Sequence, residues 1–146
     1  MTVVSYSGIN IQYPISREIV SGKKTIETRT YPIPKKYIGI PLLIVETPGK
    51  EGEFKARIIG KIRFSKCFMY SSKIAFYRDG KKHLVTPNSR WAWKDKPKWV
   101  WIIESVDIFK VPIPAGRVGI RFTLNMKIPE ASLSQSGQKP KAQIRS

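Results

Sequence analysis

The sequence predicts an α+β fold, in which a mixed or antiparallel β-barrel carries short flanking helices. Three observations lead to this class. Short segments of alternating or continuous apolar residues recur between prolines and glycines, as in all-β barrels. Only one clear helical segment occurs, close to the N-terminus, and a Trp-x-Trp strand at residues 99–101 comes late. At 146 residues the chain has the length of one domain that can bury a core.

The N-terminal part of the chain is predicted to form a strand and then a short helix. Residues 8–13 alternate apolar residues with small or polar ones, which is typical of a half-buried strand. Pro14 suits the first turn of a helix, and three of the apolar residues that follow share one helical face. Gly22 is suited to ending that helix, because glycine takes a positive φ without steric penalty. We therefore expect a helix over residues 14–21.

Further segments have the composition of strands, and a short helix is expected over residues 72–77. Gly60 interrupts one of the strands and indicates a bulge or a barrel corner. Residues 111–119 hold two prolines and two glycines and are predicted to form a stiff turn. The predicted strands are residues 25–31, 41–46, 56–64, 99–109 and 120–124.

The last part of the chain differs in composition from the rest. From residue 127 the sequence turns to Ser, Gln, Lys and Pro, with few large apolar groups and with four basic residues against one acidic. Such a segment buries too little apolar surface to offset its ordering entropy. We expect one domain over residues 1–126, followed by a flexible basic tail over residues 127–146.

Charge is the strongest bulk signal. The chain has 27 Lys and Arg against 10 Asp and Glu, a net charge of +17, which is the electrostatic signature of a protein that binds polyanions. Residues 61–98 alone hold eleven basic and two acidic residues and are the expected phosphate-facing surface. RNA is the expected partner and DNA an alternative. A membrane partner is not expected, because no amphipathic basic helix is evident. The sequence does not indicate an oligomeric state.

Several classes of protein are excluded or disfavoured. Cys67 is the only cysteine, so neither an internal disulfide nor a cysteine-based zinc site can form. His83 is the only histidine, which excludes a ribonuclease using two, and we expect it in a solvated loop. Neither a secretion signal nor an apolar run of membrane length is evident, so a cytoplasmic location is expected. No nucleotide-cofactor or nucleophile motif is found, and we expect neither cofactor nor metal.

Residues 24–29 carry three charges of both signs, Lys24, Glu27 and Arg29. Burying unpaired charge costs several kcal/mol, so these side chains are predicted to face a cleft or solvent. In an extended strand Glu27 and Arg29 share a face, whereas Lys24 points to the other one. The three side chains therefore converge only if Lys24 lies in the turn before the strand begins.

The spacing G-x-K-x-x-E-x-R in this stretch matches the signature of the ASCH family, a branch of the PUA-like β-barrel superfamily. Residues 11–14 and the helix after them resemble the opening strand and helix of that family. Residues 101–104, followed by the Pro-rich turn at residues 112–119, resemble its closing hairpin. Taken in order, the resemblance spans residues 8–124 and implies a PUA-like barrel.

The resemblance implies RNA binding in a cleft beside the barrel, which the signature residues line. Some ASCH proteins are similar to ribonucleases, and one bacterial branch is an amidohydrolase acting on acetylated cytidine. In that branch a lysine and a threonine of the signature act with a separate glutamate. Lys24 matches the lysine, Glu27 stands in place of the threonine, and Glu104 is a candidate for the separate glutamate. The alternative function is a hydrolase using Lys24 and Glu27, in which Glu27→Gln is expected to abolish turnover and to leave binding intact or slightly stronger.

The candidate contacts to nucleic acid are aromatic and basic residues. Trp91 and Trp93 stand among charged residues and are predicted to stack on bases, as is Tyr31 beside the signature. Trp99 and Trp101 are predicted to pack in the core, because large aromatic side chains are core formers first. The basic residues expected to contact phosphates are Lys24, Arg29, Lys61, Arg63, Lys66, Lys81, Lys82, Arg90, Lys94, Lys96 and Lys98.

Overall fold

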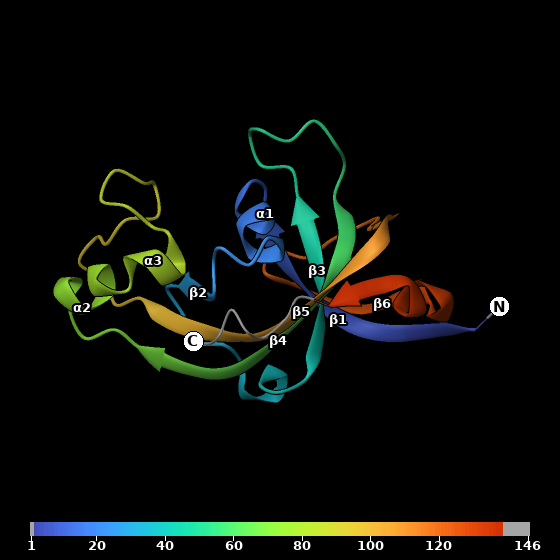
Figure 1. Ribbon diagram of the computed structural model, residues 1–146, viewed down its shortest axis with the longest axis horizontal. Helices are drawn as coiled ribbons and strands as arrows, with labels where there is room; N and C mark the ends of the chain where they lie inside the picture. Colours follow the sequence, from blue (N-terminus) through green and yellow to red (C-terminus); the bar gives the residue numbers. More distant parts are fainter. Residues whose placement is uncertain (1, 139–146) are drawn as a thin grey trace.

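The computed structural model describes residues 2–138, and a curved mixed sheet forms its body (Figure 1). The strands are β1 (Val3–Gln12), β2 (Ile26–Arg29), β3 (Pro41–Thr47), β4 (Arg57–Met69), β5 (Trp99–Pro114), β6 (Phe122–Pro129) and β7 (Ser136–Gln138). The helices are α1 (Ile15–Val20), α2 (Lys73–Arg78) and α3 (Gly80–His83), with 3₁₀ turns η1 (Lys35–Tyr37) and η2 (Glu130–Gln135). In Figure 1, α2 and α3 lie with β2 at one end of the sheet, and β6 lies toward the other.

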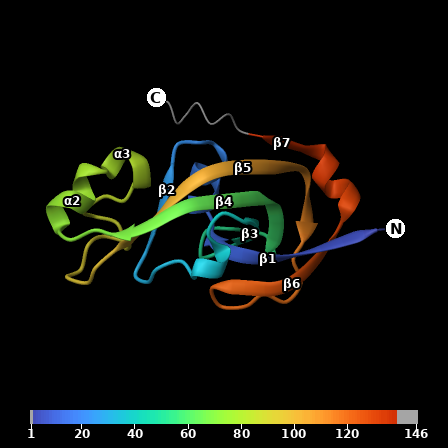
Figure 2. The same cartoon turned by 90° about the horizontal axis from the view of Figure 1, so that it is seen from below.

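The strands follow the order β2-β5-β4-β3-β1-β6, and β7 pairs with β5. Only the β1–β3 pair is parallel among the strand pairs of the described residues. Figure 2 shows the long strands β4 and β5 arching past β3 and β1. The α+β class and the mixed sheet are confirmed. Closure into a barrel is not confirmed, because β2 and β6 end the path of paired strands.

The core lies on both faces of the sheet, and β3 shows why. Leu42 and Ile44 pack on one face with the fully buried Trp101, while Leu43 and Val45 pack on the other. A strand buried on both faces reads as a continuous apolar run, as residues 41–46 do. A third cluster forms around Phe76 of α2 and holds that helix against the end of the sheet.

Gly60 lies at irregularities in the pairing of β4 with both neighbouring strands, as the sequence predicts. A Cβ atom there would sit 2.1 Å from the backbone oxygen of Asp107 on β5. We expect Gly60→Ala to lower the free energy of unfolding by about 1–3 kcal/mol, because two paired strands must separate to admit the methyl group. Urea denaturation measures this loss. The control is Gly80→Ala, where a Cβ atom meets nothing within 4 Å; equal losses in both variants would contradict the explanation.

β5 continues to Pro114, past the start of the turn predicted over residues 111–119. The backbone N–H of Ala115 donates to the carbonyl of Ala56, so in this part of β5 every second N–H points toward β4. Pro112 and Pro114 have the opposite parity, and their nitrogens, which carry no hydrogen, point away from β4. The two prolines therefore do not interrupt the pairing, and the turn begins later than expected.

The sheet also extends past the domain boundary expected at residue 126. β6 runs to Pro129, where Ile128 is fully buried, and β7 pairs with residues 107–109 of β5. The first residues of the predicted flexible tail, 127–138, therefore lie in regular elements: Ile128 belongs to the second core cluster, Leu133 packs against it, and β7 pairs with β5 through its backbone. Residues 139–146 lie outside the described residues. No helix within residues 2–138 is both long and apolar enough to cross a membrane.

Candidate functional site

A cavity of about 410 Å³ is lined by β1, β2 and the loop between β5 and β6, a volume typical of small-molecule sites. The signature residues Lys24, Glu27 and Arg29 all line this cavity, as does Tyr31. The middle of the chain contributes further lining residues, Val85, Trp91 and Lys98. Segments far apart in the sequence therefore meet at one concave surface, which we call the signature cavity.

The three signature charges converge because the strand begins late. β2 starts at Ile26, so Lys24 lies in the preceding turn, where its backbone N–H donates to the carbonyl of Glu18. Gly22 takes a φ of +85° at the end of α1, which turns the chain toward the sheet. Lys24 therefore lies in the turn before the strand, which is the position that its convergence with Glu27 and Arg29 requires.

Glu27 joins the two cations. Its Oε1 lies 3.7 Å from Lys24 Nζ, and its Oε2 accepts from Arg29 Nε at 2.9 Å. Lys24 is 4% exposed and Glu27 is 6% exposed. Lys24 Nζ also donates to the backbone carbonyl of His83 at 2.5 Å. The charges thus face the cavity as a buried, mutually paired group, and only one carboxylate serves two cations.

The remaining donors of Arg29 are directed at the protein itself. Its two terminal nitrogens donate to the Tyr31 hydroxyl at 2.8 Å and to the Asn10 carbonyl at 3.0 Å. Its guanidinium carbon also lies 5.4 Å from the centre of the Trp101 ring. A guanidinium held on so many sides supports the wall of the cavity, and little of its donor capacity is left for a bidentate phosphate contact.

The pKa values of Lys24 and Glu27 both lie below their ordinary values, that of Lys24 because of burial and that of Glu27 because of ion pairing. Burial lowers the pKa of the Lys24 ammonium below its ordinary 10.5, and the opposing effects of Glu27 and Glu18 do not offset it. Burial alone raises the pKa of the Glu27 carboxyl, but the charges of Arg29 and Lys24 outweigh it and bring the pKa below 4.5. At neutral pH Glu27 is therefore ionised, and Lys24 loses its proton more readily than an ordinary lysine.

Lys98 is the second buried lysine of the signature cavity. It is 8% exposed, and within residues 2–138 its ammonium makes no hydrogen bond or ion pair. Burial and the positive charge of Lys94 lower the pKa of Lys98, although Glu27 raises it. Lys24 and Arg29 each form an ion pair with Glu27, so Lys98 is the cation of this lining that has no ion pair among the described residues.

Trp91 stands at the boundary of two hollows. A second cavity of about 420 Å³ adjoins the first, and Lys24, Val85 and Trp91 line both. Trp91 is 39% exposed, and the guanidinium of Arg90, which lines only the second cavity, lies 4.5 Å from its ring centre. The indole therefore offers an accessible ring beside both cavities.

Other predicted contacts line neither cavity. Lys61 pairs with Asp107 at 3.8 Å, and Lys82 pairs with Asp79 at 4.0 Å. Trp93 is half-buried and packs against Phe76 of α2, so it belongs to the core below that helix. The predicted contacts outside both linings are Lys61, Arg63, Lys66, Lys81, Lys82, Trp93, Lys94 and Lys96.

His83 is fully buried, and its expected place in a solvated loop is wrong. Its Nδ1 accepts from the backbone N–H of Val85 at 2.9 Å, which leaves Nε2 to donate to the carbonyl of Phe76 at 2.6 Å. Its ring stacks on that of Phe76, with centres 4.2 Å apart. Burial lowers the pKa of this imidazole, so it is neutral at pH 7. His83 thus fixes the α2–α3 segment, and its carbonyl receives Lys24.

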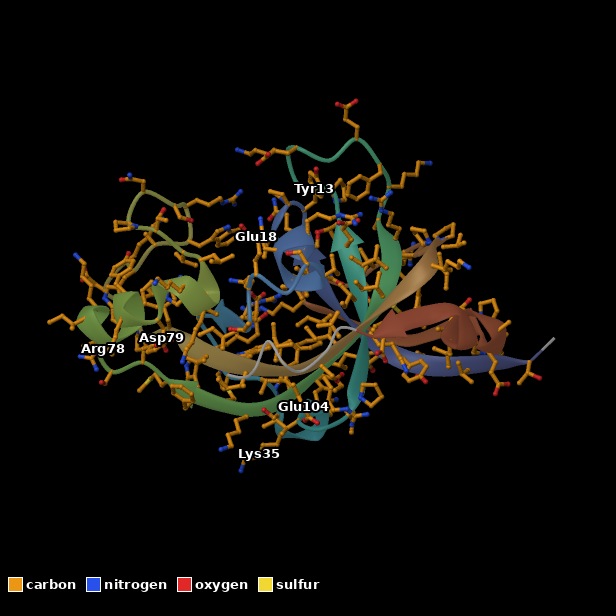
Figure 3. The ribbon with its side chains drawn as sticks, viewed as in Figure 1. Tyr13, Glu18, Lys35, Arg78, Asp79 and Glu104 are labelled. Atoms are coloured by element: carbon orange, nitrogen blue, oxygen red, sulfur yellow. The ribbon has the colours of Figure 1, made fainter. Side chains whose placement is uncertain are left out.

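Glu104 does not join the signature residues. Figure 3 shows it on the side of η1 and Lys35, whereas Glu18 on α1 lies on the other side of β4 and β5. Neither cavity has Glu104 in its lining. The separate glutamate of the amidohydrolase branch therefore has no counterpart at this position. Within residues 2–138 no group of three or more His, Cys, Asp or Glu side chains could hold a metal ion.

Asn10 is a site residue that the sequence analysis does not identify. Its amide nitrogen donates to the carbonyls of Gly119 at 2.6 Å and Ile120 at 3.1 Å, and its oxygen accepts from Thr123 Oγ1 at 3.3 Å. These bonds tie the loop after β5 to the rim of the signature cavity. The only sign of Asn10 in the sequence is its place between two isoleucines in a segment that alternates apolar and polar residues, which does not by itself indicate a site residue.

The fold resembles that of solved ASCH proteins. The structure of ASCH from Zymomonas mobilis matches with a TM-score of 0.65 at 16% identity, over 90% of this chain and 95% of that one. A serine-to-alanine variant of the Z. mobilis protein matches with a TM-score of 0.62 at 17% identity, over 86% and 89% of the two chains. A tyrosine-to-phenylalanine variant matches with a TM-score of 0.61 at 16% identity, over 90% and 98%.

No protein-family model matches the chain, and no curated protein matches it. At this level of identity the likeness concerns the fold. The chain therefore has the fold of the ASCH domain, as its signature predicts.

Proposed function

We propose that the protein binds RNA and that the signature cavity receives one nucleotide of the strand. The observation that carries this proposal is the cavity itself. It combines a volume of about 410 Å³, an excess of cations over carboxylates and an accessible indole, in a chain of net charge +17. A flat nitrogen heterocycle attached to an anionic backbone is the ligand that matches all of these properties.

The parts of the site have separate roles in this proposal. The Glu27–Arg29 pair holds the floor of the cavity in place, and Trp91 supplies a ring for base stacking. The exposed Lys94 and Lys96 lie before β5, in the same segment as Lys98. They contact the phosphates of the strand that lie outside the cavity. Each phosphate neutralised on a single strand adds about −0.7 to the slope of log affinity against log salt.

Fluorescence anisotropy with a short single-stranded RNA and the DNA of the same sequence tests the proposal. We expect the RNA to bind more tightly and to remain bound near about 150 mM salt, because a nucleotide held in a cavity presents its 2′-hydroxyl to the protein. Equal, weak binding of both strands that disappears with salt would mean that net charge alone is responsible, and the proposal would fall.

Trp91→Ala is expected to weaken RNA binding by about 1–3 kcal/mol, which is the contribution of stacking one base on an aromatic ring. Trp91→Phe should retain most of the affinity, because a ring remains. The matched control is Phe68→Ala, since Phe68 is an exposed aromatic, 46% accessible, that lines neither cavity. Anisotropy titrations of the three variants decide the matter: similar losses for Trp91→Ala and Phe68→Ala would contradict a stacking role for Trp91.

The second candidate function is hydrolysis of RNA or of a modified nucleoside in the same cavity. The observation that favours it is the lowered pKa of Lys24, which makes this amine a better proton acceptor at moderate pH than other lysines. Glu27, ionised and paired with Arg29, orients Lys24 across 3.7 Å. Chromatography of single-stranded RNA and of acetylated cytidine after incubation with the protein would reveal products if turnover occurs.

A further inference from the structure

Lys98 raises a question that RNA binding in general does not answer. Lys98 is a buried residue in the wall of the signature cavity, and its ammonium makes no hydrogen bond or ion pair within the described residues, whereas Lys24 and Arg29 both pair with Glu27. Its position is fixed by the sheet. The Lys98 carbonyl accepts from the backbone N–H of Tyr70, and the next residue, Trp99, pairs with Arg29 across β5 and β2. Such a charge is tolerated where a ligand supplies the counterion.

The charges of the cavity indicate what that counterion is. Glu27 is the only acidic residue in the lining and faces three cations, Lys24, Arg29 and Lys98, so the lining carries two more positive charges than negative ones. A terminal phosphate monoester carries about −1.5 to −2 at pH 7, whereas an internal phosphodiester carries a single negative charge and a nucleoside none. The monoester matches the cavity best.

The burial of Lys98 favours a chain end for a second reason. An internal phosphodiester has the strand continuing on both sides, and both continuations must pass the walls that leave Lys98 only 8% exposed. A terminal phosphate has one continuation, which can leave along the face of Trp91 toward the second cavity, since Trp91 lines both.

Building on the proposed function, we infer that the signature cavity binds a phosphorylated end of RNA, with the terminal phosphate monoester at Lys98. The phosphate takes the place of the missing counterion, and the nucleotide that carries it occupies the rest of the cavity. Lys98 is then the residue that distinguishes a phosphorylated end from a hydroxyl end.

The test compares one short single-stranded RNA in three forms, with a 5′-phosphate, with a 3′-phosphate and with neither, by anisotropy against the full chain. We expect one phosphorylated form to bind about tenfold more tightly than the unphosphorylated form, as for a charge-assisted contact in a buried site. Whichever end gives the gain identifies the polarity of the bound strand.

Lys98→Met is expected to remove this preference, so that the variant binds the phosphorylated and unphosphorylated RNAs with equal affinity. The matched control is Lys96→Met, because Lys96 is an exposed lysine two residues away that lines neither cavity, and there the preference should persist. Lys98→Met breaks no hydrogen bond or ion pair within residues 2–138, so its thermal midpoint should equal or exceed that of the wild type. Lys98→Gln provides a polar second variant with the same expected loss of preference.

The possible results separate this inference from the proposed function. If the wild type binds all three RNAs equally, or if Lys98→Met keeps the preference, the phosphate site is wrong while RNA binding stands. If no form of RNA binds more tightly than the matched DNA, the proposed function fails and the phosphate site fails with it.

Discussion

Glu27→Gln is expected to lower the free energy of unfolding by about 3–5 kcal/mol, one of the largest losses available to a single substitution in this chain. The glutamine keeps the size of the side chain and one acceptor for Arg29. It removes, however, the carboxylate that forms ion pairs with both Lys24 and Arg29, and these two cations stay in the wall of the cavity. Urea denaturation at pH 7 measures the loss.

The pH dependence of stability gives an independent check. Because the folded-state pKa of Glu27 lies below 4.5, its contribution is complete above that pH and is lost as the pH falls through the folded-state value. Glu27→Gln should therefore lose less stability than the wild type on acidification. Glu53→Gln, at an exposed carboxylate, should stay within about 0.5 kcal/mol of the wild type. A Glu27→Gln protein as stable as this control would show that the pairing contributes nothing.

The role of Glu27 in the structure differs from the role expected from the sequence. From the signature alone, Glu27 is a candidate base whose replacement removes turnover and spares binding. In the structure it is a buried counterion between two cations, and its lowered pKa makes it a weak base. A loss of activity in Glu27→Gln therefore cannot by itself identify a catalytic group, because the cavity wall changes with it.

The sequence predicts those features that local pattern determines. The spacing of Lys24, Glu27 and Arg29 gives the condition for their convergence: Glu27 and Arg29 share one face of a strand, and Lys24 joins them only from the turn before that strand. The continuous apolar run of β3 indicates burial on both faces, and the bulge at Gly60 follows from the cost of a side chain there.

The features that the sequence misses depend on contacts that no periodicity reveals. His83 is buried with both ring nitrogens bonded: Nε2 donates to the carbonyl of Phe76, and Nδ1 accepts from the backbone N–H of Val85. Trp93 has the same charged neighbours as Trp91, but only Trp93 meets the core under α2. The positive charge of the chain predicts the class of partner, but it does not predict where that partner binds. Most of the lysines of residues 61–98 lie outside both cavities.

Lys24→Met gives the largest effect expected of any variant if the cavity is catalytic, a loss of turnover of about 10²- to 10⁴-fold, the range typical of removing a general acid or base. As the base, neutral Lys24 takes a proton from the attacking water or hydroxyl, so kcat/KM should rise with pH through its folded-state pKa, which lies below 10.5. Turnover of RNA and of acetylated cytidine, followed by chromatography across pH, measures both effects.

The matched control for this test is Lys23→Met, the exposed lysine immediately before Lys24 in the chain. Lys24→Met leaves Glu27 paired with Arg29 at 2.9 Å, so the buried carboxylate keeps a counterion and the fold should survive. A folded Lys24→Met protein that keeps full turnover would exclude Lys24 as the base. If neither the wild type nor the control turns over either substrate while both bind RNA, the low pKa of Lys24 reflects burial alone, and the cavity is a binding site.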